Sequence, residues 1–379
     1  MSAEGTVSRQ APGKLFVSGE YAVIEPGTPA IVMAVDRYVR VTVSEPAGAD
    51  IVIVSDLLDG EARFRLKAGG GLVWCGLGDG ERARSGLACV LSVIEVMHTQ
   101  LAERGWSVSG AHLSISSELH DRGTKFGLGS SGAVTVATVA ALAAYHGLDL
   151  SPEARFRLAL IATARLNTRS SCADLAASTW GGWIAYRAPD RAAVLATAAR
   201  KGIDEAVRAE WPGFEVRRLP PPARLGMEIG WTGTPVSTDS LVSRLGRRHW
   251  QGSTAHKRFM ARMTDCVHTS ITALEKGDRE TLLHGIRRSR RALAELDEAV
   301  GLGIFTPKLT ALCEAAEVLG GAAKPSGAGG GDCGIALMPA EADARIGKLR
   351  TRWATAGVRH LPLRPAEIST SERNVRNDR

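Results

Sequence analysis

The stretch Lys125-Phe126-Gly127-Leu128-Gly129-Ser130-Ser131-Gly132 leads directly into residues 133–147 (AVTVATVAALAAYHG), which are mostly small or apolar and end in a glycine. Because this segment lacks proline, we expect a helix over residues 130–146. The glycines let the backbone approach a ligand without Cβ clashes, and the free N–H groups at the start of a helix favour a negative charge. The stretch therefore predicts a phosphate-binding loop, in which a serine hydroxyl can reach a phosphate-bound Mg²⁺.

The spacing of Gly127, Gly129 and Gly132 also fits the G-x-G-x-x-G pattern of dinucleotide-binding proteins. That pattern needs a strand that runs directly into the glycines and a second strand with an acidic end about 20 residues later. Here a polar loop, residues 118–125, separates the plausible strand 111–117 from the glycines, and another helix start follows Gly147. A glycine-rich turn capped by serines is the purely structural alternative. The loop alone leaves all three interpretations open.

Two further segments lie toward the opposite ends of the chain. Residues 11–23 (APGKLFVSGEYAV) are near the N-terminus, and residues 324–337 (KPSGAGGGDCGIAL) are near the C-terminus. Together with the central loop they resemble the three signature motifs of the GHMP kinase superfamily, in its order and spacing, over about Ala11 to Leu363. The resemblance implies an α/β (α+β two-layer) GHMP kinase fold, with a ribosomal S5-like N-terminal domain and a ferredoxin-like C-terminal domain.

Three other stretches resemble the branch of the superfamily that phosphorylates phosphomevalonate. They are residues 231–242 (WTGTPVSTDSLV), residues 179–186 (TWGGWIAY) and the pair Asp332-Cys333. The resemblance implies an ATP-dependent kinase that converts 5-phosphomevalonate to 5-diphosphomevalonate for isoprenoid synthesis, with Mg²⁺ as cofactor. Two alternatives stay open: a sibling kinase acting on an alcohol such as mevalonate or homoserine, and a relative that senses nucleotides or metabolites without catalysis.

Length and composition agree with an enzyme of this kind. The chain has 379 residues, which exceeds the usual limit of one core and predicts two domains. Its six scattered cysteines form no C-x-x-C pair, as is typical of a reduced cytoplasmic protein, and we expect no structural metal. The net charge of +7 is spread along the chain, so we expect no nucleic-acid partner. We find no apolar run of membrane-spanning length and expect a cytoplasmic monomer or homodimer without a membrane partner.

Hydrophobic periodicity predicts two α/β halves. We assign residues 1–200 to an ATP-binding domain, 201–368 to a second domain and 369–379 to a flexible tail. The first half is predicted to contain strands at 39–44, 51–54, 62–67 and 112–116, and helices at 81–104, 130–146 and 152–165. After Pro220-Pro221-Pro222 we expect a strand at 224–231. Helices follow at 237–250, 255–276, 279–300, 308–319 and 341–356, with a last strand at 358–363.

Phosphoryl transfer needs a triphosphate clamp, charge neutralisation and an oriented acceptor. The loop supplies the clamp through Lys125, Gly127, Leu128, Gly129, Ser130, Ser131 and Gly132. By resemblance, the Ser131 hydroxyl faces Mg²⁺. Lys14, which follows Pro12 and Gly13, is the candidate catalytic cation between the acceptor and the γ-phosphate. Its alternative is a surface lysine beside a turn.

Asp174 is the candidate catalytic carboxylate, because residues 170–182 resemble the superfamily's Ser-Gly-x-Asp loop ahead of a Gly-Gly strand. Cys172 stands where that loop usually has glycine. The alternative for Asp174 is a helix N-cap. Further substrate-binding candidates, in addition to Lys14, are Arg169, Ser237, Ser240, Gly329, Gly330, Gly331 and Asp332, and the basic residues Arg244, Arg247, Arg248 and Lys257 are additional candidates for holding an acceptor phosphate.

Overall fold

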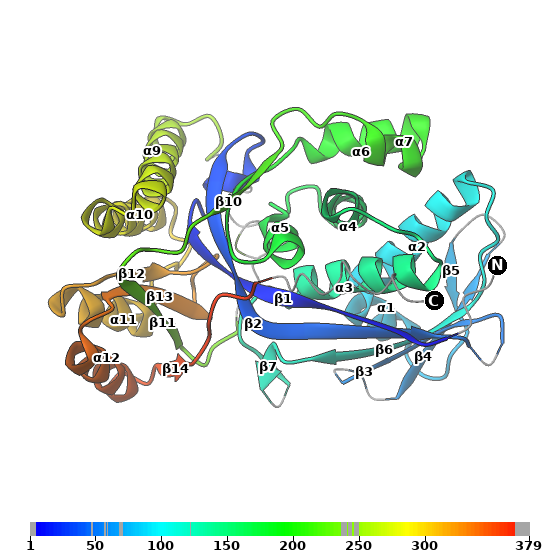
Figure 1. Ribbon diagram of the computed structural model, residues 1–379, viewed down its shortest axis with the longest axis horizontal. Coiled ribbons are helices and arrows are strands. Elements are labelled where there is room, and N and C mark those ends of the chain that lie inside the picture. Colours follow the sequence, from blue (N-terminus) through cyan, green and yellow to red (C-terminus); the bar gives the residue numbers. More distant parts are fainter. Residues whose placement is uncertain are drawn as a thin grey trace, which may run out of the picture.

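The computed structural model of the chain describes residues 5–46, 48–56, 58, 60–67, 71–121, 123–235, 241, 245 and 250–367. It contains an eight-stranded sheet, a four-stranded sheet and a short hairpin. In Figure 1 helices α3, α4 and α5 lie over one side of the large sheet, and the small sheet lies with α9–α12 at the left. The mixed α/β architecture expected from the sequence is confirmed.

The large sheet has the strand order β10-β9-β2-β6-β3-β4-β5, with β1 paired to β2. Its strands are β1 (Val7–Ser18), β2 (Pro29–Ser44), β3 (Ile51–Ser55), β4 (Glu61–Leu66), β5 (Leu72–Trp74), β6 (Ala111–Ser117), β9 (Trp183–Arg187) and β10 (Glu215–Leu219). β1 and β2 run antiparallel over most of their length, and their register shifts between Pro12 and Gly13. This irregularity lies immediately before Lys14, and such shifts re-aim the side chains that follow them.

Helices fill the space on one face of the large sheet. They are α1 (Gly80–Gly86), α2 (Ala88–Glu103), α3 (Ser130–Tyr145), α4 (Pro152–Leu166), α5 (Ala173–Trp180), α6 (Arg191–Lys201) and α7 (Ile203–Arg208). α3 is buried on nearly all sides, and its alanines and valines allow close packing against its neighbours. The predicted single helix over 81–104 is wrong, because the chain bends by 80° between α1 and α2. Asp79 caps α1 through the N–H groups of Glu81 and Arg82.

The small sheet has the order β12-β13-β11-β14. Its strands are β11 (Leu225–Trp231), β12 (Ala322–Pro325), β13 (Cys333–Pro339) and β14 (Arg359–Leu361), and its helices are α9 (Thr254–Lys276), α10 (Arg279–Val300), α11 (Pro307–Val318) and α12 (Asp343–Thr355). The side chains of Ser253, Asp278 and Thr306 cap α9, α10 and α11, which explains where these helices begin. These helices agree with the predicted positions to within a few residues.

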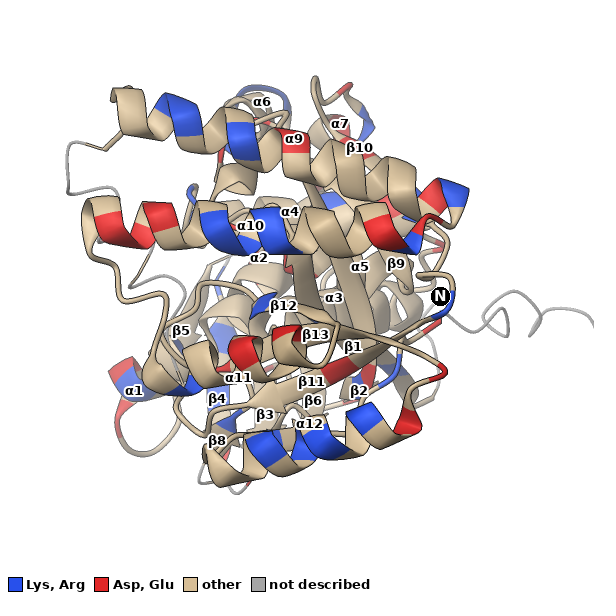
Figure 2. Ribbon diagram, turned by 90° about the vertical axis from the view of Figure 1, so that its left-hand side faces the viewer, with Lys and Arg blue, Asp and Glu red and all other residues tan. Residues whose placement is uncertain are grey.

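Basic residues are distributed over this half. Figure 2 shows Lys and Arg on each of α9, α10 and α12, with acidic residues on the same helices. On α10, Arg288 pairs with Asp265 and Arg290 pairs with Glu317. Much of the positive charge of α10 is therefore matched within the protein. Among the described helices, none alone is long and apolar enough to cross a membrane, and α1 with α2 meets that test only as a bent pair.

The division into two domains stays a proposal, and the extent of the large sheet indicates where the boundary between them lies. β10 continues the large sheet to Leu219, beyond the boundary we assigned at residue 200, so we now propose a junction within residues 220–224. After β14 the chain returns to the large sheet, where Pro365 pairs with Val35 and the Gly182 N–H donates to the Ala366 carbonyl. The assigned tail, 369–379, lies outside the described residues.

Candidate active site

The glycine-rich loop lies between a small hairpin and α3. The polar loop predicted at 118–125 instead contains the hairpin strands β7 (His120–Asp121) and β8 (Thr124–Lys125). Gly127 and Gly129 have φ values of 80° and 76°, a left-handed conformation that glycine adopts without strain. Gly129 is the N-cap of α3, so the free N–H groups of the helix follow the loop directly. Because a hairpin precedes the loop and helix α4 follows α3, the dinucleotide-binding interpretation does not fit.

Lys14 is attached to the loop through its backbone. Its N–H donates to the Leu128 carbonyl at 2.7 Å. Lys14 is 9% exposed, and a Cβ atom on Gly129 would lie 2.9 Å from Lys14 Cγ and 3.1 Å from Cε. The stem of Lys14 therefore lies directly across Gly129, which leaves no room for a side chain there. The interpretation of Lys14 as a surface lysine beside a turn is wrong.

Asp174 lies against the same helix start. A Cβ atom on Gly132 would be 2.6 Å from Asp174 Oδ2, and one on Gly129 would be 3.5 Å from Asp174 Cβ. Lys14 and Asp174 thus both border Gly129, one from β1 and one from α5. The N-cap interpretation of Asp174 is wrong, because Cys172 occupies the N-cap of α5 and Asp174 lies in the first turn.

Cys172 adopts, in the loop before α5, a backbone conformation that is more usual for glycine. Its φ is 56°, a left-handed conformation that is strained for any residue with a Cβ atom. The side chain is completely buried, and burial raises the pKa of the Cys172 thiol to about 12, with a further contribution from the nearby Asp174 charge. The Tyr186 hydroxyl donates to the Ser171 carbonyl at 2.8 Å, which helps to hold this conformation.

The third motif completes the site from the small sheet. It includes Gly329, Gly330 and Gly331, the first two with positive φ, followed by Asp332. A Cβ atom on Gly127 would be 2.3 Å from Asp332 Cγ, so this carboxylate lies against the phosphate loop. Two backbone hydrogen bonds hold Asp332. Its N–H donates to the Thr234 carbonyl at 2.8 Å, and its carbonyl accepts from the Thr232 N–H at 2.9 Å.

The structure therefore brings together Lys14, Asp174, Asp332 and the loop of residues 127–132. Ser130 and Ser131 form the first turn of α3, where Ser131 is exposed. Three of the predicted cations are not shown to contact this cluster. They are Lys125 on β8, Arg169 in the loop before α5 and Lys257 on α9, and all three are exposed. Ser237, Ser240, Arg244, Arg247 and Arg248 lie outside the described residues.

Sequence reasoning missed Arg359 as a neighbour of the loop. Its guanidinium lies 5.4 Å from the centre of the Phe126 ring and 4.7 Å from that of Trp231, and it pairs with Asp121 at 3.0 Å. The residue before the phosphate loop is thus packed against the small sheet. Periodicity carries no signal for a contact between residues more than 200 positions apart.

The comparisons with known proteins agree with this geometry. Residues 88–182 match the family model for the GHMP kinases N terminal domain, and residues 270–355 match the model for the GHMP kinases C terminal. A phosphomevalonate kinase from Streptomyces sp. (strain CL190) is 60% identical over 369 residues, covering 96% of this chain and 98% of the relative.

Two solved structures have the same fold over nearly their whole length. The Lin0012 protein from Listeria innocua is 33% identical, with a TM-score of 0.86, over 96% of this chain and 99% of that one. The phosphomevalonate kinase of Streptococcus pneumoniae, solved with phosphomevalonate and AMPPNP, is 27% identical, with a TM-score of 0.81, over 95% and 100%. The chain described here therefore belongs to the GHMP kinase superfamily and is most like its phosphomevalonate kinases.

Proposed function

We propose that this protein transfers the γ-phosphoryl group of ATP to the phosphate of 5-phosphomevalonate, producing 5-diphosphomevalonate and ADP. The observation that carries the choice of substrate is the 60% identity to a phosphomevalonate kinase across 96% of the chain. The convergence of Lys14 and Asp174 on Gly129 supplies a cation and a carboxylate at the start of a helix. That arrangement suits phosphoryl transfer and argues against a relative that has lost catalysis.

The loop of residues 127–132 would hold the triphosphate with N–H groups at the start of α3. Mg²⁺ prefers oxygen ligands, and the Ser131 hydroxyl in the first turn of α3 would be one of them. The Asp174 carboxylate, which lies against Gly132, could supply another. In the described part of the chain, no group of three or more His, Cys, Asp or Glu residues is placed to hold a metal. This suits an ion that keeps water and phosphate ligands. When bound, Mg²⁺ would offset the charge of the transferring phosphoryl group.

The acceptor needs little activation. A phosphate monoester has its second pKa near 6 and is largely ionised at neutral pH. An acceptor oxygen attacks the γ-phosphorus, the bond to the β–γ bridging oxygen breaks, and ADP leaves with that electron pair. Asp174 would orient the acceptor, and the Lys14 ammonium would lie between the two anionic groups. An alcohol acceptor would in addition need its proton removed.

Bringing two anions together requires further cations, and Arg169 is our first candidate. It lies in the loop directly before α5, its side chain is exposed, and its N–H is held by Asn167 Oδ1 at 2.9 Å. Lys125, the glycines 329–331 and Asp332 would complete the phosphate-binding surface. The roles of Ser237 and Ser240, a cytoplasmic location and a monomeric or homodimeric state stay predictions.

ADP release measured with phosphomevalonate, mevalonate and homoserine tests the acceptor. We expect turnover with phosphomevalonate, and comparable turnover with mevalonate would contradict the proposal. Arg169→Ala tests the phosphate contact: a charge-assisted hydrogen bond contributes about 1.5–3 kcal/mol, so the KM for phosphomevalonate should rise roughly 10- to 100-fold while that for ATP stays unchanged. Arg200→Ala, at an exposed arginine on α6, is the matched control. An unchanged acceptor KM would exclude Arg169 from the pocket.

A further inference from the structure

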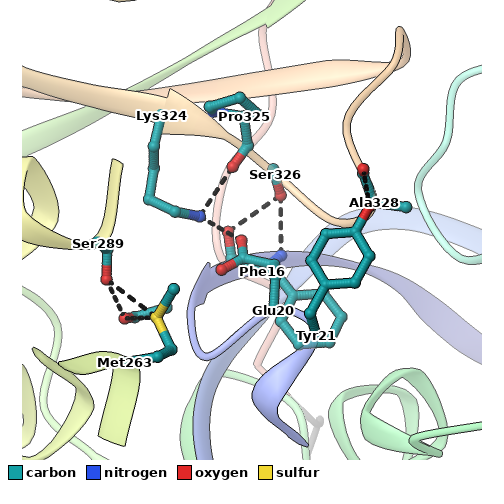
Figure 3. Close-up of polar contacts among 10 residues, drawn as sticks. Phe16, Glu20, Tyr21, Met263, Ser289, Lys324, Pro325, Ser326 and Ala328 are labelled. Atoms are coloured by element: carbon teal, nitrogen blue, oxygen red, sulfur yellow. Dashed lines mark hydrogen bonds and ion pairs between the residues drawn. The ribbon is translucent and has the colours of Figure 1, made fainter. Parts of the chain in front are cut away.

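Glu20 and Lys324 form an ion pair that is completely enclosed by the protein. Lys324 is 0% exposed and Glu20 2%, although they are 304 positions apart. The Lys324 ammonium also donates to the Pro325 carbonyl at 2.8 Å. Figure 3 shows the two side chains facing each other from β12 and from the turn after β1. The pair joins the third motif to the first.

Stability alone does not explain such a pair. Burial lowers the pKa of Lys324, the Glu20 charge opposes that effect, and the Lys14 charge adds to it. Glu20 Oε2 has no hydrogen-bond partner among the described residues. A buried ion pair often stabilises a fold no better than apolar side chains of similar volume, and in some proteins it serves instead to specify one geometry.

Two more side chains tie the same segments together. Ser326 Oγ accepts from the Phe16 N–H at 2.9 Å and donates to the Phe16 carbonyl at 3.0 Å. The Tyr21 hydroxyl donates to the Ala328 carbonyl at 2.5 Å. The third motif is thus attached to β1 and its following turn at three points, which Figure 3 shows side by side.

Lys14 lies next to these contacts between β1 and the third motif. It precedes Phe16 by two residues on β1, its ammonium is 5.3 Å from the Phe16 ring centre, and a Cβ atom on Gly327 would lie 3.8 Å from Lys14 Nζ. The alignment of β1 with the third motif therefore sets how close Gly327 lies to the Lys14 ammonium.

We propose that Glu20 and Lys324 are positioning residues that fix the third motif against β1 and so place Lys14 for phosphoryl transfer. This inference rests on the function proposed above for Lys14. A positioning role differs from a purely stabilising role in one respect: a folded protein without the Glu20–Lys324 pair should bind both substrates normally but transfer the phosphoryl group slowly. A small displacement of a reacting group has a large effect on rate.

The test is the double variant Glu20→Leu with Lys324→Met, which replaces both charges by apolar groups and leaves neither partner alone. Arg217→Met with Glu275→Leu is the control, because that exposed pair joins β10 to α9. Circular dichroism and thermal melting establish folding, and single-turnover assays report the chemical step. We expect a 10- to 100-fold slower step, KM values for ATP and phosphomevalonate within threefold, and a wild-type rate in the control.

A folded double variant with the wild-type single-turnover rate would overturn the proposal, as would an equal loss in the control. If the double variant does not fold, Tyr21→Phe removes only a hydroxyl donor to the third motif and should slow the step threefold to tenfold. A wild-type rate in that variant would also overturn it. The wild-type rate with phosphomevalonate tests the proposed function, whereas the ratio of variant to wild-type rates tests the pair.

Discussion

Replacing Gly132 with alanine should separate activity from stability. Gly132 lies in the first turn of α3, and the new Cβ atom would be 2.6 Å from Oδ2, 2.7 Å from Cγ and 2.8 Å from Cβ of Asp174. An ordinary contact begins at 3.4 Å, so the carboxylate must move by about 0.8 Å. Because a displacement of about 1 Å at a reacting group can slow a reaction ~10²-fold, we expect kcat to fall roughly 10- to 100-fold.

The fold should tolerate this change. Alanine is favoured over glycine inside a helix by up to about 1 kcal/mol, which offsets part of the roughly 1–3 kcal/mol that overpacking costs. Gly347→Ala is the matched control, because Gly347 lies in α12 and a Cβ atom there meets nothing within 4 Å. The control should gain up to about 1 kcal/mol of unfolding free energy and keep its activity.

The assay is ADP release at saturating ATP and phosphomevalonate, with unfolding followed by denaturant titration of both variants. A folded Gly132→Ala protein with wild-type kcat would refute the reasoning, because Asp174 would then tolerate displacement and could not be the group that orients the acceptor. A fall in kcat that only matches the unfolded fraction would refute it as well.

Three further outcomes are expected. Lys14→Met should lower kcat by more than it lowers ATP affinity, since the charge acts mainly in the transition state; equal losses would make Lys14 a ground-state ATP contact. Burial, together with the nearby His146, lowers the pKa of His98 to about 4. Below pH 6.5 the unfolded chain therefore binds a proton that folded His98 does not, and the unfolding free energy should fall by about 2 kcal/mol from pH 7 to 5. His98→Leu should flatten that dependence in denaturant titrations, and an unchanged slope would exclude His98 as its source. Cys172→Gly should be more stable than Cys172→Ala by about 1 kcal/mol, because both lack the thiol and only glycine adopts φ of 56° without strain; equal stabilities would contradict the strain.

The parts of the site that are local in sequence could be predicted. The loop and α3 were found within one residue of their ends, because glycines at the start and Gly147 after the helix define it. The meeting of Lys14 and Asp174 on that loop was expected only from the resemblance of three separated motifs. No periodicity within β1 or α5 says that these two side chains border the same glycine.

Other features could not be predicted for physical reasons. The sequence of residues 81–104 fits a single helix, but the chain bends at Leu87. Tertiary packing, and not helix propensity, decides where that helix breaks. The boundary that we assigned at residue 200 falls within α6, and α7 and β10 follow before the chain leaves the large sheet. The Glu20–Lys324 pair joins residues at opposite ends of the chain, and only the folded structure shows that two charges inside apolar motifs neutralise each other.

The charges of the site explain why a metal and additional cations belong to the proposed reaction. Among the described residues, the Lys14 ammonium and the Asp174 and Asp332 carboxylates lie against the glycines of the phosphate loop, and these three side chains sum to a formal charge of −1. The Arg359–Asp121 pair beside the loop adds no net charge. Lys324 does not change that sum, because Glu20 neutralises it inside the protein. Two anionic substrates cannot meet in such a site on the strength of Lys14 and helix N–H groups alone. Mg²⁺ and one arginine, for which Arg169 is the nearest candidate along the chain to Asp174, would add three positive charges and so change the charge that the two substrates meet from −1 to +2.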